Sequence, residues 1–168
     1  MMMELRPLTL DDGRDVYDML QEIPAEENGF FNNQHGVSFE DFQAWLPAAI
    51  EAAEQTELVD GWKVPQSYWW FYVNGNPVGM CKFRLFLTEK LLESGGHIGY
   101  AVRPSARGRG YGKMMLAAML QKAREKGLER VLITTNRDNI ASQHVALANG
   151  AVQENRSPDH CHFWIDLT

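Results

Sequence analysis

The chain has 168 residues, of which 45% are hydrophobic and 23% charged, and its formal net charge is −6 at pH 7. This size and composition predict a single globular domain over residues 1–168. The negative charge argues against a nucleic-acid partner, because no basic stripe exists outside one short loop. No apolar run is long enough to cross a membrane and the chain begins with no signal peptide, so we expect a cytoplasmic protein with no membrane partner.

Cysteine and histidine usage argues against a metal site. The two cysteines, Cys81 and Cys161, lack the spacing of a metal-binding motif or a disulfide framework, and the five histidines are scattered along the chain. We therefore expect buried thiols in a reducing compartment and no metal ion.

The first third of the chain predicts one short strand and two helices. The helix signals are apolar residues at helical spacing behind a polar capping residue. In order, we expect a strand at 5–8, a helix from a cap at Asp11 or Asp12 to about Glu22, a polar loop at 25–37, a helix capped by Ser38 and running to about residue 53, and a loop at 56–65.

A β-hairpin follows. Residues 68–73 are almost all aromatic and β-prone, residues 74–77 (Asn-Gly-Asn-Pro) form a turn, and residues 78–87 form the returning strand. The aromatic run is either core packing or a binding platform. About one helical turn is expected at residues 89–92.

The most informative stretch runs from His97 to Leu116. Ile98–Val102 alternates as a strand whose small residues allow a close approach to its backbone, and Pro104 ends it. A loop rich in glycine and arginine then opens a helix with one apolar side. Beyond this helix we expect an end at Gly127, a buried and parallel strand at 131–135, a helix capped by Asp138 or Asn139 and running to Asn149, and two closing strands at 151–154 and 160–167.

The loop has the chemistry of an anion site. A helix N-terminus offers unpaired N–H groups and a favourable dipole, and glycines allow a ligand to reach those groups. We expect a phosphate or pyrophosphate here, with a plain surface loop as the alternative. The residues concerned are the glycines Gly108, Gly110 and Gly112 and the cations Arg107, Arg109 and Lys113.

Two common phosphate motifs do not fit the loop. A P-loop needs Ser or Thr after Gly112-Lys113, where Met114 stands, and the dinucleotide motif has a different glycine spacing. The pattern Arg107-x-x-Gly110-x-Gly112 resembles that of the GNAT (Gcn5-related N-acetyltransferase) superfamily. The resemblance implies an α/β (α+β) fold: a mixed, mostly antiparallel central sheet of about seven strands, with splayed fourth and fifth strands (98–102 and 131–135), flanked by about four helices.

The resemblance also implies a set of acetyl-CoA contacts. The loop from Arg107 to Lys113, including Tyr111, would hold the pyrophosphate, and the N–H of Val102 would polarise the thioester carbonyl. Asn139, followed by Gly150 at the family's spacing, would bind the pantetheine arm, with Ser142 as a second contact. Capping of the last helix is the alternative role of Asn139.

Both catalytic groups common among relatives are absent. Gly96 stands where many relatives have a glutamate, and Ala146 stands where many have a tyrosine. His97 has the right intrinsic pKa for a base, although a neighbouring strand residue points to the opposite face unless a bulge intervenes. Tyr100 shares its strand face with position 96 and is either catalytic or part of the pocket wall. His144 is expected to be a surface or packing residue.

Glu26 and Glu27, before the second helix, either attract a cationic amine or are simply solvated. The resemblance implies an acetyl-CoA-dependent N-acetyltransferase that acts directly on a primary amine of a small molecule, peptide or protein. A catalytically silent acyl-CoA-binding sensor and an acyltransferase for longer chains are the alternatives. The acceptor and the oligomeric state stay open, and a homodimer is compatible with the sequence.

Overall fold

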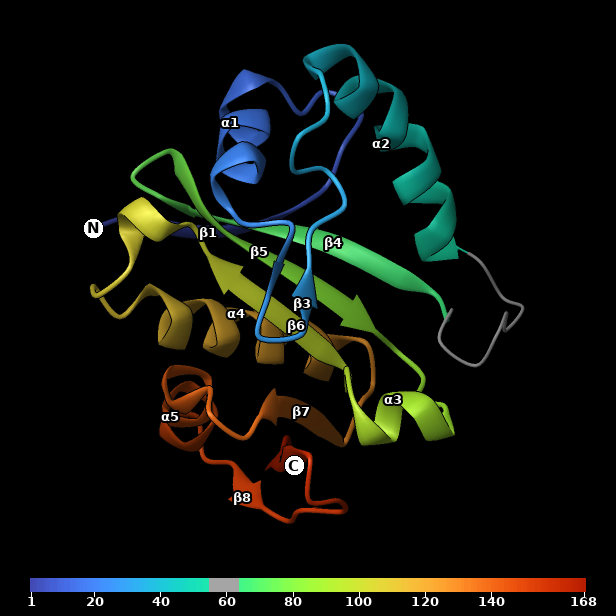
Figure 1. Cartoon of the computed structure of the whole chain (residues 1–168), viewed down its shortest axis with the longest axis vertical. Coiled ribbons are helices and arrows are strands. Elements are labelled where there is room, and N and C mark those ends of the chain that lie inside the picture. The colour runs from blue at the N-terminus through green and yellow to red at the C-terminus, as the bar shows by residue number, and fades with distance from the viewer. Residues whose placement is uncertain (55–63) are drawn as a thin grey trace.

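The strands form three antiparallel groups in this computed structural model, which describes residues 1–54 and 64–168 (Figure 1). The first sheet has the order β1-β4-β5-β6, with bounds Met3–Pro7, Gln66–Val73, Asn76–Arg84 and Ile98–Val102. The second has the order β7-β9-β8, with bounds Arg130–Asn136, His160–Asp166 and Val152–Gln153. A small hairpin joins β2 (Glu26–Glu27) to β3 (Phe30–Phe31).

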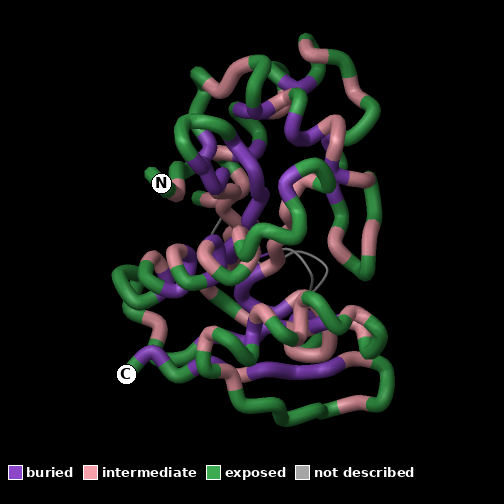
Figure 2. Tube along the Cα trace, turned by 90° about the vertical axis from the view of Figure 1, so that its left-hand side faces the viewer, coloured by how far each residue is buried: buried purple, intermediate pink, exposed green. Residues whose placement is uncertain are grey.

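Helices cover both faces of the first sheet. On one face lie α1 (Arg14–Glu22) and α2 (Phe39–Glu54), and on the other lies α4 (Tyr111–Glu125) (Figure 1). The remaining helical segments are α3 (Glu89–Glu93), a 3-10 turn at Pro104–Ala106, and α5 (Ile140–Ala148), which packs beside α4. Buried residues follow the inner strands, whereas most connecting loops are exposed (Figure 2).

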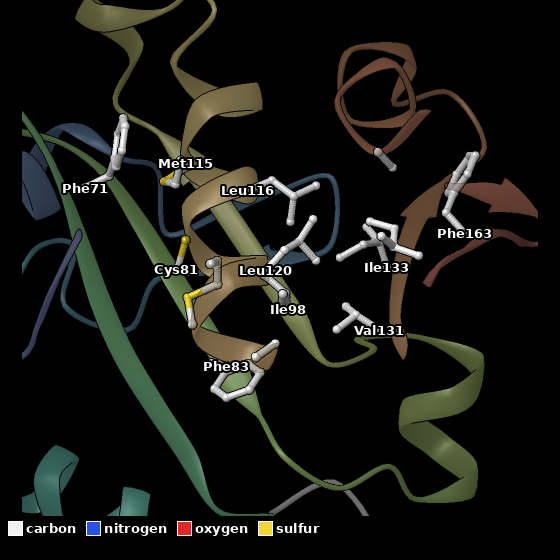
Figure 3. Close-up of a cluster of buried hydrophobic side chains, with 14 of the residues drawn as sticks. Phe71, Cys81, Phe83, Ile98, Met115, Leu116, Leu120, Val131, Ile133 and Phe163 are labelled. Atoms are coloured by element: carbon white, nitrogen blue, oxygen red, sulfur yellow. The ribbon is translucent and has the colours of Figure 1, made fainter. Parts of the chain in front are cut away.

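The alternation of strand residues divides the apolar side chains between two cores. On β5, Met80 faces the core beneath α1 and α2, whereas Cys81 and Phe83 face the core beneath α4. The second core continues across the gap between the sheets, because α4 side chains pack against both of them. Its members include Ile98, Met115, Leu116, Leu120, Val131, Ile133 and Phe163 (Figure 3).

The predicted architecture is confirmed, with three local corrections. The first helix is capped by Gly13, because Asp12 instead accepts hydrogen bonds from the Thr9 N–H and the Trp70 indole. The polar loop expected at 25–37 contains the β2–β3 hairpin. The strand expected to be parallel, now β7, pairs antiparallel with β9 and forms no ladder with β6 within the described residues. The expected loop at 56–65 lies outside the described residues, apart from its last two positions.

The two sheets meet at one point, just before β6. The His97 N–H donates to the Leu132 carbonyl at 2.9 Å, and the Leu132 N–H donates to His97 Nδ1, also at 2.9 Å. The preceding Gly96 has φ +63°, and a Cβ placed on it would lie 2.5 Å from the Leu132 oxygen. Only glycine fits this position, for both conformational and steric reasons. Beyond this junction β6 and β7 diverge.

The imidazole of His97 is neutral in the folded protein. The residue is 7% exposed, and burial, followed by the nearby Arg130 and Arg84, lowers its pKa from 6.5 to about 4. A neutral imidazole is what the junction needs, because Nδ1 must accept a hydrogen bond from Leu132.

At the junction, Gly96 combines a positive φ with a close approach to a backbone atom. We expect Gly96→Ala to lower the free energy of unfolding by about 1–3 kcal/mol more than Gly127→Ala, because overpacking adds to the conformational strain. Gly127 is the matched control, since its φ is +91° and no atom lies within 4 Å of an added Cβ. Urea unfolding of both variants measures the difference, and equal losses would show that the close approach to Leu132 costs nothing.

The pKa of His97 predicts a pH-dependent stability. Because the unfolded imidazole titrates near 6.5 and the folded one near 4, its contribution is complete above about pH 6.5 and is lost as the pH falls towards 4. The loss amounts to about 3 kcal/mol. His97→Asn keeps an acceptor for Leu132 without a titrating group, so the stability difference between wild type and variant should change between pH 7 and 4. Parallel pH profiles would contradict this assignment.

Candidate active site

A cavity of about 460 Å³ opens where β6 and β7 diverge. Its walls are β6, the end of β7, the loop before α4, the first turns of α4 and α5, and the β2–β3 hairpin. The hairpin lies across β6: a Cβ added to Gly99 would lie 3.5 Å from the Phe30 ring, and one added to Gly29 would lie 3.3 Å from the Asn136 side chain. The sequence predicted that the small residues of β6 allow another group to approach its backbone closely. At Gly99 that group is the Phe30 ring.

The edge of β6 that faces the cavity carries backbone N–H groups with no partner among the described residues. The Arg103 N–H donates to Val78 and the Arg84 N–H donates to His97, so the odd-numbered residues of β6 face β5. Backbone groups alternate between the two edges of an antiparallel strand. The N–H groups of Ile98, Tyr100 and Val102 therefore point towards the gap. The register is continuous from Ile98 to Val102, with no bulge.

The N-terminus of α4 forms one end of the cavity. Gly110 is its N-cap, in the left-handed conformation at φ 80°, and offers no side chain to cap the helix. Gly108 is also left-handed, and neither glycine has an atom within 4 Å of an added Cβ. The first-turn N–H groups have no intrahelical acceptors, and Tyr111, Gly112 and Lys113 line the cavity there. This geometry suits an anion.

Gly112 has a different reason to be glycine. A Cβ on it would lie 3.4 Å from Val145 on α5 and 3.7 Å from Val102 on β6. The missing side chain thus allows the two helices and the strand to pack closely, which brings the two walls of the cavity together.

The loop cations have different surroundings. The Arg107 guanidinium pairs with Glu27 on the hairpin, at 2.6 Å and 3.3 Å, and its Nε donates to the Val102 carbonyl at 3.0 Å. Arg109 is exposed and lies outside the cavity lining, whereas Arg107 and Lys113 line it. Glu26 also lies outside the lining and accepts the Gly29 N–H. Glu27 therefore faces an arginine of the loop.

Asn139 caps α5, since its side-chain oxygen accepts the Ser142 N–H at 3.3 Å, and both residues line the cavity. The Ser142 hydroxyl donates to the Tyr100 hydroxyl at 3.1 Å, and Tyr100 donates to the Ser142 carbonyl at 3.2 Å. Burial raises the pKa of Tyr100 to about 12, so its phenol stays protonated at neutral pH. Thr135, another lining residue, has a buried hydroxyl without a hydrogen-bond partner in the described part of the chain.

The two catalytic candidates lie in different places. Tyr100 lines the cavity, whereas His97 lies outside its lining with Nδ1 bonded to Leu132. His144 is exposed on α5, as expected. The described residues contain no group of three His, Cys, Asp or Glu side chains that could hold a metal ion. They also contain no helix long and apolar enough to cross a membrane.

The far end of the cavity carries residues that the sequence analysis did not single out. Lys82 and Arg84 from β5, Phe30 and Phe31 from the hairpin, and His160 from β9 all line it. They come from three separate segments and form no motif. The one available signal was two cations at alternate positions of an otherwise apolar strand.

A sequence model of the acetyltransferase (GNAT) family matches residues 25–151. No curated protein matches the chain significantly.

Solved structures share the fold at low identity. RimL, a ribosomal-protein alpha-N-acetyltransferase in complex with coenzyme A, has a TM-score of 0.72 at 17% identity, with 98% of this chain and 93% of that chain covered. The N-acetyltransferase PseH of Campylobacter jejuni with acetyl coenzyme A has a TM-score of 0.66 at 10% identity, covering 99% and 100%. YncA of Salmonella typhimurium with its cofactor acetyl-CoA has a TM-score of 0.62 at 15% identity, covering 99% and 94%.

The family match covers most of the chain, including the loop, the splayed strands and the start of α5, and the fold agrees with it. The chain therefore belongs to the acetyltransferase (GNAT) family, which confirms the family predicted from the sequence.

Proposed function

We propose that the protein transfers the acetyl group of acetyl-CoA directly to a primary amine of a small molecule or peptide. The observation that carries this proposal is the course of the cavity, which runs from the uncapped N-terminus of α4, along the unpaired edge of β6, to a polar far end. Such a cavity has one place for an anion and another for an acceptor, with backbone donors between them.

The residues at the loop end fit the parts of acetyl-CoA. Gly108 to Lys113 supply N–H groups and positive charge for the pyrophosphate, and Arg109 adds charge from outside the cavity. The pantetheine amides need donors and acceptors inside the gap. The edge of β6 at Val102, the Asn139–Ser142 turn and the unpaired Thr135 hydroxyl supply them. An orphaned buried hydroxyl in this position is what an amide ligand would satisfy.

Backbone N–H groups are proposed to stabilise the oxyanion of the transition state. Val102 is the candidate from the sequence, and its carbonyl is bonded to Arg107 of the loop. Tyr100 presents its N–H from the same edge, two residues and roughly 6.6 Å farther from the loop. We therefore assign the pantetheine to the N–H of Val102 and the thioester carbonyl to the N–H of Tyr100.

Transfer needs an unprotonated amine. For an alkylammonium with a pKa near 10.4, deprotonation at pH 7 costs about 4.6 kcal/mol. We propose that Tyr100, protonated and lining the cavity, turns its single O–H from the Ser142 carbonyl to the leaving thiolate during transfer, and that His97 has a structural role at the junction. The reaction then forms the amide N–C bond as the C–S bond breaks, and releases one proton and free coenzyme A.

A covalent cysteine intermediate has no support in the cavity. Cys81 and Cys161 are both buried, and neither lines the cavity. Burial also raises the pKa of the Cys81 thiol, which makes it a poor nucleophile.

The proposed function is tested by incubating the protein with acetyl-CoA and a panel of amines while following free thiol. Transfer supports it, whereas binding of acetyl-CoA without turnover on any amine would favour a silent acyl-CoA sensor. Gly110→Glu should weaken acetyl-CoA binding at least roughly tenfold, because it places a carboxylate in the anion site. Gly150→Glu is the matched control, since Gly150 also has a positive φ and open space around it. Equal affinities in calorimetry would show that the loop is not the site.

The pair between Glu27 and Arg107 predicts a gain of affinity. Glu27→Gln should strengthen acetyl-CoA binding by up to roughly fivefold, because it frees Arg107 and removes a negative charge beside the anion site. Glu26→Gln is the control, since Glu26 pairs with the hairpin backbone instead. Calorimetric titrations of the two variants are compared, and a weaker affinity in Glu27→Gln would mean that the pair orders the site for the cofactor.

A further inference from the structure

The far end of the cavity is positively charged. Lys82 and Arg84 lie two residues apart on β5, so both side chains leave the same face of the sheet and both line the cavity. Burial, and then its neighbour Arg84, lower the pKa of Lys82 to about 8, and burial also lowers the pKa of Arg84. Two cations are thus held close together and partly away from water.

Neither cation has a carboxylate partner among the described residues. Lys82 donates to the Phe31 carbonyl and lies 4.8 Å from the centre of the Phe30 ring. Arg84 donates through Nε to Gln66 and through one terminal nitrogen to the carbonyls of Gly95 and Gly96, all of them neutral groups. Donors on Lys82 and on the second terminal nitrogen of Arg84 remain for a ligand.

The carboxylates around the cavity are engaged elsewhere. Glu27 pairs with Arg107 at the loop end, and Glu93 accepts hydrogen bonds from Ser157 and pairs with His160 at 3.2 Å. The two ends are well separated, because Arg107 bonds to Val102 and Arg84 to His97, at opposite ends of β6. Val102 and His97 are five residues apart, which makes roughly 16 Å of extended chain. A pyrophosphate bound at the loop is therefore too far away to neutralise the positive charges of Lys82 and Arg84.

We propose that the acceptor amine also carries an anionic group, a carboxylate or a phosphate, which binds to Lys82 and Arg84. This inference rests on the proposed acetyl transfer and names its substrate class. Charges removed from water are normally paired, and here the substrate supplies the missing partner. The Phe30 and Phe31 hairpin covers the same end, so the acceptor lies beneath it, beside Gly99.

Matched acceptors test the proposal in the wild-type protein. An amino acid is compared with its amide, and phosphoethanolamine with ethanolamine, in the free-thiol assay. We expect kcat/KM to be roughly ten- to a hundredfold higher for the anionic member of at least one pair, because the free energy of a charge-assisted hydrogen bond corresponds to a ratio of that size. A preference within the first pair indicates that the site binds a carboxylate, and a preference within the second indicates that it binds a phosphate. Equal values in both pairs, with turnover present, overturn the proposal and leave the acetyltransferase activity standing.

Variants of Lys82 test whether this residue causes the preference for an anionic acceptor. Lys82→Met keeps most of the unbranched side chain without its charge, and should raise KM for the anionic acceptor while acetyl-CoA affinity stays unchanged. Lys82→Arg should restore the preference. Lys126→Met removes the same charge from the exposed end of α4 and is the control. A preference that survives in Lys82→Met, in a variant whose thermal unfolding matches wild type, rules Lys82 out as the anchor.

A binding measurement separates this proposal from the proposed function. The same acceptor pairs are titrated by calorimetry into protein saturated with coenzyme A. Tighter binding of the anionic member, lost in Lys82→Met, supports the site even when no turnover is detected. Absence of turnover with selective anion binding counts against the acetyl transfer alone. Absence of any charge preference in binding and in turnover counts against the acceptor site.

Discussion

The reciprocal hydrogen bonds between His97 and Leu132 determine where the two sheets of the protein meet. Next to them β6 pairs only with β5 and β7 pairs only with β9 within the described chain, so the two strands separate beyond this point. Gly96 allows the contact because no Cβ would fit against Leu132. The N-terminus of α4, the outer edge of β6 and the cationic far end all border the gap that follows. A single well-packed junction thus holds open the cavity that the chemistry needs.

The lining of this cavity is mainly positive, although the protein as a whole is acidic. The chain carries a net charge of −6, yet the described lining includes Lys82, Arg84, Arg107 and Lys113 against one carboxylate, Glu27. Positive charge is therefore concentrated at both ends of a gap in an otherwise acidic protein. A cleft lined by one sign of charge attracts ligands of the other sign. This pattern suits two anionic substrates, an acyl-CoA at the loop and an acidic acceptor opposite.

Local signals in the sequence predicted the parts of the fold that depend on neighbouring residues. The β4–β5 hairpin, the strand–loop–helix around Gly110 and the Asn139 cap all follow from turn, glycine and capping chemistry within a few residues. The pairing of Arg107 with Glu27 joins positions 80 residues apart, and the Lys82–Arg84 end is completed by a hairpin from another third of the chain. Hydrophobic periodicity and motif spacing carry no information about such long-range contacts, because these contacts depend on how the elements pack in three dimensions. The parallel pairing expected for β7 was wrong for the same reason.

Packing leaves no room at positions 96 and 146 for the glutamate and tyrosine that the family resemblance implies. At position 96 a side chain would collide with Leu132, and at position 146 the alanine is 0% exposed within the core beneath α4. A tyrosine there would displace core side chains. Ser142 lies one helical turn before Ala146 on the same side of α5, roughly 6 Å away. Because Tyr100 reaches Ser142 from β6, this chain brings a phenol to that wall of the cavity from the opposite strand. In the proposed reaction this phenol would serve the leaving thiolate, and the acceptor would lose its proton to solvent.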